Sequence, residues 1–118
     1  MNIKIYKKNF DLTEPFRQYL QDKFKVVEKY QKNIISFVIE LSRDQHHNKG
    51  EVFTVAVHVS LPNKQNIILK ETSSDARAAV DDVQEKLIRQ LVKYKEKNIS
   101  KIRKNIRRFK SLKFWQKN

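Results

Sequence analysis

The sequence predicts an α+β domain with the element order β-α-β-β-β-α, in which a four-stranded sheet carries two helices on one face. Apolar and polar residues alternate in four segments, as expected for strands that bury one face. In two other segments apolar residues recur every three or four positions, which is the spacing of one helix face. The chain has 118 residues and no linker rich in glycine, serine or proline, so one domain is expected.

The first strand and first helix are expected in the N-terminal quarter of the chain. Residues 3–6 alternate as a short strand, and residues 9–11 form a turn. The helix is expected over about 14–30, where Thr13 caps it and Pro15 is tolerated in its first turn. Its apolar face comprises Phe16, Leu20, Phe24 and Val27.

Three further strands are expected in the middle of the chain. The apolar faces of the first two comprise Ile35, Phe37, Ile39 and Leu41, then Phe53, Val55, Val57, Val59 and Leu61. The polar segment 42–51 contains Gly50 and is expected to be an exposed loop. Pro62 interrupts the next connection, and Ile67 with Leu69 marks the fourth strand.

A second, longer helix closes the domain. Ser73 or Ser74 is expected to cap it. Its apolar stripe comprises Ala76, Val80, Val83, Leu87, Leu91 and Tyr94. The pattern holds to about Lys97, so the predicted domain spans residues 1–97.

Residues 98–118 form a basic tail that contains aromatic residues. Its apolar positions are turned by about 80° from the earlier stripe, so we expect a break near Asn98, with Ser100 capping a new segment. Four interpretations remain open: a disordered end, a short helix docked on the domain, a segment that folds on RNA, and a helix on an anionic membrane. On RNA, Phe114 and Trp115 would stack on unpaired bases.

Composition excludes several functional classes. The chain has no cysteine, which removes disulfides, thiolate zinc sites and cysteine nucleophiles. Gly50 is the only glycine, so phosphate-binding loops and dinucleotide fingerprints are absent. No apolar run has the length of a signal peptide or a membrane span, and we expect a cytoplasmic protein without cofactor, metal or small-molecule substrate.

Positive charge is concentrated at the C-terminal end. Residues 1–92 carry 15 basic and 12 acidic side chains, whereas residues 93–118 carry 11 basic and one acidic. Lys86, Arg89, Lys93, Lys97 and Lys104 fall along one edge of the second helix beside its apolar stripe. Segregated charge of one sign favours a polyanionic partner, because neutralising phosphates releases counterions.

Two segments resemble a known family. LTEPFRQYL at 12–20, followed by DKF at 22–24 and EKY at 28–30, resembles the first helix of the bacterial ribosome hibernation-promoting factors, also called ribosome-associated inhibitors or the sigma-54 modulation protein family. EKLIRQLVKYKEK at 85–97, preceded by DARAAVD at 75–81, is similar to the signature of their second helix.

The resemblance implies a double-stranded-RNA-binding-like fold that binds the small ribosomal subunit near the decoding centre. A short-form member would exclude mRNA and tRNA, inhibit translation under stress or in stationary phase, and be a monomer off the ribosome. The implied rRNA-binding residues are Lys23, Lys86, Arg89, Lys93 and Lys97; Lys25 stands one step before Val26, where the family usually has lysine. We add Lys101, Lys104, Arg107 and Arg108 of the tail on their charge.

Two other function classes are weighed against this one. A generic RNA-binding module or RNA chaperone would bind free duplex RNA as tightly as it binds ribosomes. An enzyme would have to use the three histidines, with Asp44 and Glu51 as neighbours; they are His46, His47 and His58. Adjacent histidines in an exposed loop do not make a preorganised site, so we expect no catalytic residues.

Overall fold

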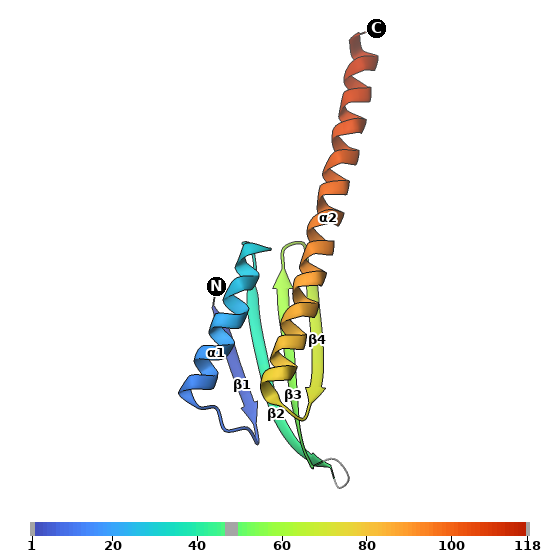
Figure 1. The fold of residues 1–118 in the computed structure, drawn as a ribbon. Helices are drawn as coiled ribbons and strands as arrows, with labels where there is room; N and C mark the ends of the chain where they lie inside the picture. The colour runs from blue at the N-terminus through green and yellow to red at the C-terminus, as the bar shows by residue number, and fades with distance from the viewer. Residues whose placement is uncertain (1, 47–49, 118) are drawn as a thin grey trace.

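The fold is that of a mixed four-stranded sheet covered on one face by two helices (Figure 1). The structure is a computed structural model that describes residues 2–46 and 50–117, and it describes side chains for residues 2–45 and 50–97. Within that part of the chain the elements are β1 (Ile3–Lys8), α1 (Glu14–Lys25), η1 (Val26–Lys29), β2 (Ser36–His46), β3 (Gly50–Leu61), β4 (Gln65–Ser73) and α2 (Ala76–Lys117). The predicted α+β class and element order are confirmed.

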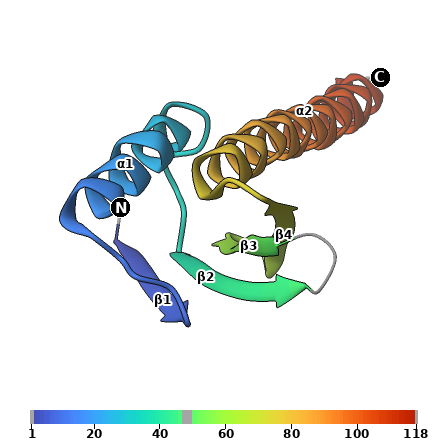
Figure 2. The ribbon, with the colours of Figure 1, turned by 60° about the horizontal axis from the view of Figure 1, so that its bottom comes forward.

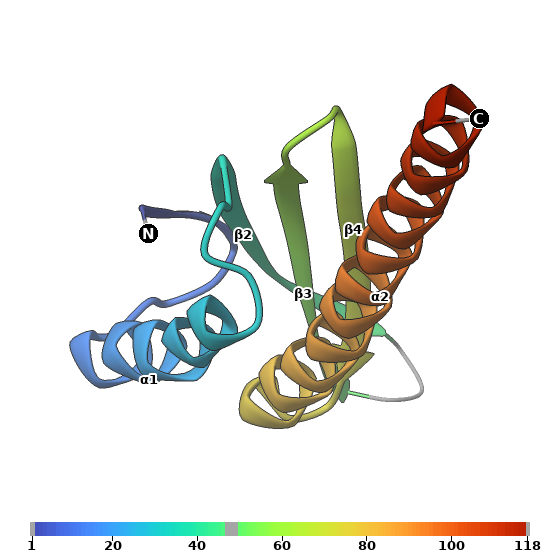
Figure 3. The same cartoon turned by 90° about the horizontal axis from the view of Figure 1, so that it is seen from above.

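The strands lie in the spatial order β1-β2-β3-β4, with β1 parallel to β2 and the other pairs antiparallel. The parallel pair requires a crossover, and α1 with η1 supplies it. Helix α2 lies on the same side of the sheet as α1, and the two helices are next to one another (Figures 2 and 3). The opposite face of the sheet is uncovered.

The core lies between this helical layer and the sheet. Its fully buried side chains are Leu20, Phe24, Val27, Phe37, Ile39, Leu41, Val55, Val57, Val59, Leu61, Ala79, Val80, Val83, Leu87 and Leu91. The rings of Phe24 and Phe37 are 5.3 Å apart and join α1 to β2. The apolar faces predicted for the helices and for the two long strands account for most of this set.

The first helix begins as predicted but changes its geometry near its end. Thr13 Oγ1 accepts a hydrogen bond from the backbone N–H of Phe16 at 3.3 Å, which caps the helix. The α-helical part ends at Lys25, and the predicted α-helix to residue 30 is completed by a 3₁₀ turn instead. The turn starts at the β-branched pair Val26 and Val27, which has weak helix propensity.

The predicted loop over residues 42–51 is wrong, because strand pairing continues through most of it. Ser42 pairs with Thr54 and His46 pairs with Gly50, so β2 and β3 form a long hairpin. Arg43 and Glu51 form an ion pair across it at 3.7 Å. Polar residues on both faces weaken the hydrophobic strand signal without weakening the backbone ladder.

Two smaller predictions also fail. Ile35 is not part of the apolar strand face: it precedes β2, and 70% of it is exposed. Asp75, rather than Ser73 or Ser74, caps α2, since its Oδ1 accepts a hydrogen bond from the N–H of Arg77 at 3.1 Å. A shift of one or two residues separates predicted and observed boundaries here.

The predicted break near Asn98 is wrong as well, because α2 runs without interruption to Lys117. The segment 76–117 contains neither glycine nor proline, so no residue in it forces the helix to end. The break was predicted because one straight helix could not bury both of its apolar stripes against the domain. Beyond the sheet the helix projects alone (Figure 1), so the second stripe has no part of the domain to pack against. Whether residues 1–97 and 98–118 act as separate functional units stays a prediction.

We expect Leu87→Ala to lower the free energy of unfolding by about 2–5 kcal/mol, because Leu87 is fully buried between α2 and the sheet. Urea denaturation followed by circular dichroism measures the change. Ile68→Ala removes an equally large side chain that is 68% exposed, and it should cost less than about 0.5 kcal/mol. Equal losses in the two variants would contradict the packing described here.

Candidate nucleic-acid interface

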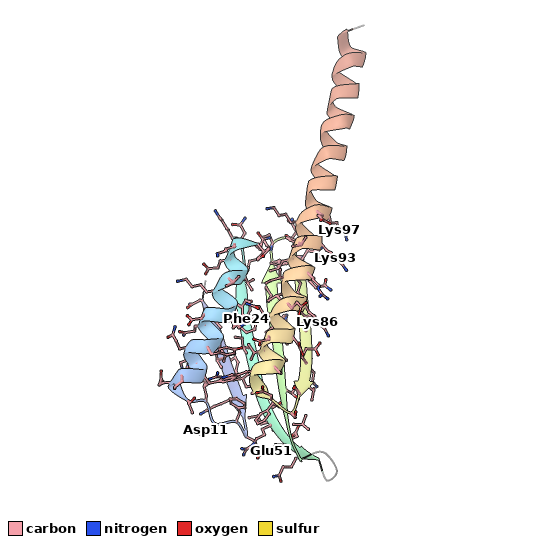
Figure 4. All side chains as sticks on the ribbon, viewed as in Figure 1. Asp11, Phe24, Glu51, Lys86, Lys93 and Lys97 are labelled. Atoms are coloured by element: carbon pink, nitrogen blue, oxygen red, sulfur yellow. The ribbon has the colours of Figure 1, made fainter. Side chains whose placement is uncertain are left out.

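One flank of α2 carries a row of exposed cations. The buried stripe of the helix faces β3 and β4, and the side chains of Lys86, Arg89, Lys93 and Lys97 follow beside it at helical spacing (Figure 4). Lys86 contacts Glu71 of β4, which places this row on the side of α2 that lies away from α1. We call these four residues the basic row.

The members of the basic row differ in their own ion pairs. Lys86 donates to Glu71 Oε1, and Arg89 Nη2 lies 2.6 Å from Glu85 Oε1 one turn earlier. Lys93 and Lys97 form no ion pair with any side chain that the structure describes. The Arg89–Glu85 pair is exposed and contributes little to stability, so a phosphate oxygen can replace Glu85 at small cost. Glu71 is only 22% exposed, and the Lys86 side chain, which is half exposed, carries the accessible side of that pair.

Lys23 lies on the opposite flank of α2, in the seam between the two helices. Its Nζ is 3.1 Å from Asp81 Oδ1, and its backbone carbonyl accepts a hydrogen bond from Gln84 Nε2 at 2.6 Å. Asp81 also accepts a hydrogen bond from the Tyr19 hydroxyl. The structure therefore does not bring Lys23 into the basic row, and it assigns Lys23 an intramolecular partner.

Tyr19 and Asp81 shift each other's protonation. Burial raises the pKa of the Tyr19 phenol to about 12, and the hydrogen bond to Asp81 and its negative charge act in the same direction. The hydrogen bond from Tyr19 lowers the pKa of the Asp81 carboxyl, and Lys23 lowers it further. Arg77 lies 5.1 Å from the centre of the Tyr19 ring and adds a cation–π contact. These contacts of Tyr19 and Lys23 with Arg77 and Asp81 hold α1 against α2.

Lys25 belongs to a different surface at the C-terminal end of α1. It lines an open groove of about 750 Å³ whose lining also contains two further lysines, two carboxylates and two apolar residues: Lys29, Lys32, Asp22, Glu28, Val26 and Ile34. Sequence reasoning did not group Lys29 and Lys32 with Lys25. Their nearness to Lys25 in the sequence is the signal that would have found them, although the two carboxylates partly offset the positive charge.

The remaining predicted residues divide by position. Lys101, Lys104, Arg107, Arg108, Phe114 and Trp115 belong to the helical backbone of α2, but their side chains lie outside those that the structure describes. The side chain of His46 and all of His47 also lie outside the described part. His58 is exposed on the uncovered sheet face opposite Val38 and Ile68.

Among the described residues, no group of three histidine, aspartate or glutamate side chains is placed to hold a metal ion. No described helix combines the length and the apolar character that a membrane span requires.

Comparison with known proteins identifies the family. Residues 3–99 match the model of the Sigma 54 modulation protein / S30EA ribosomal protein family. The chain belongs to this family. The match covers every strand, α1 and the part of α2 that packs on the sheet, and it ends soon after the last member of the basic row.

Relatives of known name agree with the family. A ribosome hibernation promoting factor of Azotobacter vinelandii is 29% identical over 101 residues, which cover 86% of this chain and 89% of the relative. A ribosome-associated factor Y of Haemophilus influenzae is 30% identical with the same coverage. The family resemblance that the two sequence segments indicate is thereby confirmed.

Solved structures with the same fold include the N-terminal domain of protein Y from Thermus thermophilus, with a TM-score of 0.68, and a ribosomal subunit interface protein from Coxiella burnetii, with a TM-score of 0.72. Each is 24% identical to this chain; the matches cover 80% and 81% of this chain and 99% of each structure. The fold extends over nearly all of both structures, whereas about a fifth of this chain has no counterpart in them.

We expect the Tyr19 phenol to titrate with a midpoint of about 12, and Asp81→Asn to lower that midpoint toward the ordinary value of 10.0. The substitution removes the negative charge that opposes formation of the phenolate. Ultraviolet titration of phenolate absorbance measures the midpoint, and Tyr19→Phe identifies the phase that belongs to this residue. A midpoint that Asp81→Asn leaves in place would show that the carboxylate does not act on the phenol.

The same linkage gives the sign of its effect on stability. The folded-state pKa of Tyr19 lies above its unfolded value, so the contribution of the neutral phenol is fully present below about pH 10. It is lost as the pH rises through about 12, because the unfolded chain releases the proton first.

Proposed function

We propose that this chain is a ribosome hibernation factor that binds the small ribosomal subunit near the decoding centre. There it would occupy space that mRNA and tRNA need and so inhibit translation under stress. Membership of the family and the names of the relatives from Azotobacter vinelandii and Haemophilus influenzae support a ribosomal role. The observation that carries the proposal is the basic row of α2. Its cations lie beside the buried stripe of the same helix, so the packing of α2 on the sheet holds them in a fixed position for a polyanion.

The chemistry of the row fits rRNA phosphates. Lys93 and Lys97 offer ammonium groups without a described carboxylate partner. Arg89 would exchange its exposed partner Glu85 for a phosphate oxygen, and the half-exposed Lys86 would add a phosphate contact beside Glu71. Contacts of this type fix position and orientation on RNA without reading its sequence. Recognition then depends on the shape of the rRNA and on where its phosphates lie.

Lys23 and Lys25, the two other predicted rRNA-binding residues of the domain, contribute less to binding in this proposal. Lys23 retains Asp81 as a partner, so it positions α1 against α2 and adds only a partly neutralised charge. Lys25 is exposed and lines the groove at the end of α1, which contains no member of the basic row. The action we propose is binding and steric exclusion, with no catalytic residue, and the site is the ribosome in the cytoplasm.

Replacing Lys86, Arg89 and Lys93 together with alanine should abolish inhibition of cell-free translation and weaken binding to purified small subunits by at least about tenfold. Each lost charge-assisted contact is worth about 1.5–3 kcal/mol, while the buried stripe of α2 is untouched. Co-sedimentation with small subunits measures binding, and circular dichroism verifies the fold.

The matched control removes the same charge from the uncovered sheet face, as Lys4, Lys8 and Lys70 changed to alanine. It should inhibit translation like the wild type. Full inhibition by the α2 variant, or equal loss in both variants, would refute the assignment of the row. Binding of the wild type to free duplex RNA as tightly as to small subunits would favour a general RNA-binding module instead.

A further inference from the structure

Helix α2 continues far beyond the domain that the family model describes. Among the side chains that the structure describes, Leu91 is the last fully buried one of this helix. The Tyr94 hydroxyl reaches the Pro62 carbonyl oxygen at 3.5 Å where the helix leaves the sheet. From there to Lys117 the helix extends about 35 Å at 1.5 Å per residue. The family match ends at residue 99, so it assigns no role to most of this projecting segment.

An unbroken helix carries the spacing of the basic row across Asn98. From Lys86 the positions 93, 97, 104 and 108 follow in steps of seven, four, seven and four residues, and all are lysine or arginine. Steps of seven and four return to the same face of an α-helix to within about 40°. Five cationic positions therefore lie along one face of α2 over about 33 Å.

The charge of the projecting segment selects its partner. Residues 98–118 contain eight lysine and arginine residues and no aspartate or glutamate. A second copy of the chain would bring the same charge to the contact and be repelled. Like charges four residues apart destabilise a helix, so this segment gains most from a partner that neutralises its charge. Closely spaced phosphates do so with release of counterions.

We propose that α2 is one continuous RNA-binding rail, and that its projecting part binds the phosphates of an rRNA segment beyond the footprint of the domain. The inference rests on the proposed function, since the basic row is the part of the rail that lies on the domain. The projecting part extends the binding surface along the axis of α2, on the same helix face as the basic row. RNA helices present phosphates at regular intervals and so match a straight line of cations.

The first experiment compares two variants of equal charge in the full-length chain. Changing Lys104, Arg107 and Arg108 to glutamine removes the two projecting rail cations and Arg107, which flanks them as Arg89 flanks Lys86. Changing Lys110, Lys113 and Lys117 to glutamine removes three cations from another side of the same segment. The rail variant should lose affinity for purified small subunits and lower the slope of log affinity against log salt by about 2–3, and the control by less than about 1. Equal losses would overturn the rail.

A second experiment tests continuity without changing any charge. Ser100→Pro should break the helix between the domain and the projecting part and weaken binding to small subunits as much as the rail variant does. Ser111→Pro breaks the helix after the last rail position and should bind like the wild type. Wild-type affinity for Ser100→Pro would overturn the requirement for a straight helix.

The identity of the partner follows from a tethered cleavage reagent. The chain lacks cysteine, so Ser111→Cys gives a single attachment point for an iron chelate that produces hydroxyl radicals. Cleavage of rRNA in the bound complex supports the proposal. If the chain binds and the rRNA stays intact, the segment lies on a protein or in solvent, and the proposal is overturned.

The two proposals fail in different ways. Failure of the wild type to bind small subunits refutes the proposed function. Normal wild-type binding together with unchanged affinity of the rail variant refutes this inference alone.

Discussion

The packing of one apolar stripe of α2 against the sheet is the interaction on which the rest of the structure depends. Val80, Val83, Leu87 and Leu91 are fully buried over β3 and β4, and each such side chain contributes about 1.5–3 kcal/mol by leaving water. The stripe fixes both the axis of the helix and its rotation. Once the rotation is fixed, the positions that flank the stripe are fixed as well, and the cations of the basic row become a rigid surface.

The two flanks of α2 have different electrostatic roles. On the flank toward α1, Asp81 accepts hydrogen bonds from Tyr19 and Lys23, and the charges are satisfied within the molecule. On the flank toward β4, Arg89 forms an exposed pair, Lys86 is half exposed beside Glu71, and Lys93 has no described partner. Internal pairing on one flank and available cations on the other give α2 a single side suited to phosphates.

Sequence periodicity predicted the element order and the core correctly because burial on one face leaves a strong pattern. It failed where a backbone ladder or a helix continues without burial: β2 and β3 extend through polar residues 42–51, and α2 passes Asn98. The basic row was predicted because the spacing of the apolar residues gives the angular position of the buried stripe of α2, and the row lies directly beside that stripe. The pairing of Lys23 with Asp81 was not, since it depends on how two helices meet, and no local spacing in either helix encodes that.

The central claim is that the β4 side of α2 faces rRNA on the small ribosomal subunit. A cryo-electron microscopy structure of the full chain bound to the small subunit tests it most directly. The account predicts rRNA phosphates within ion-pair distance of Lys93 and Lys97, with the uncovered face of the sheet turned away from the rRNA. A complex in which the sheet face contacts rRNA and the basic row of α2 faces solvent would contradict it.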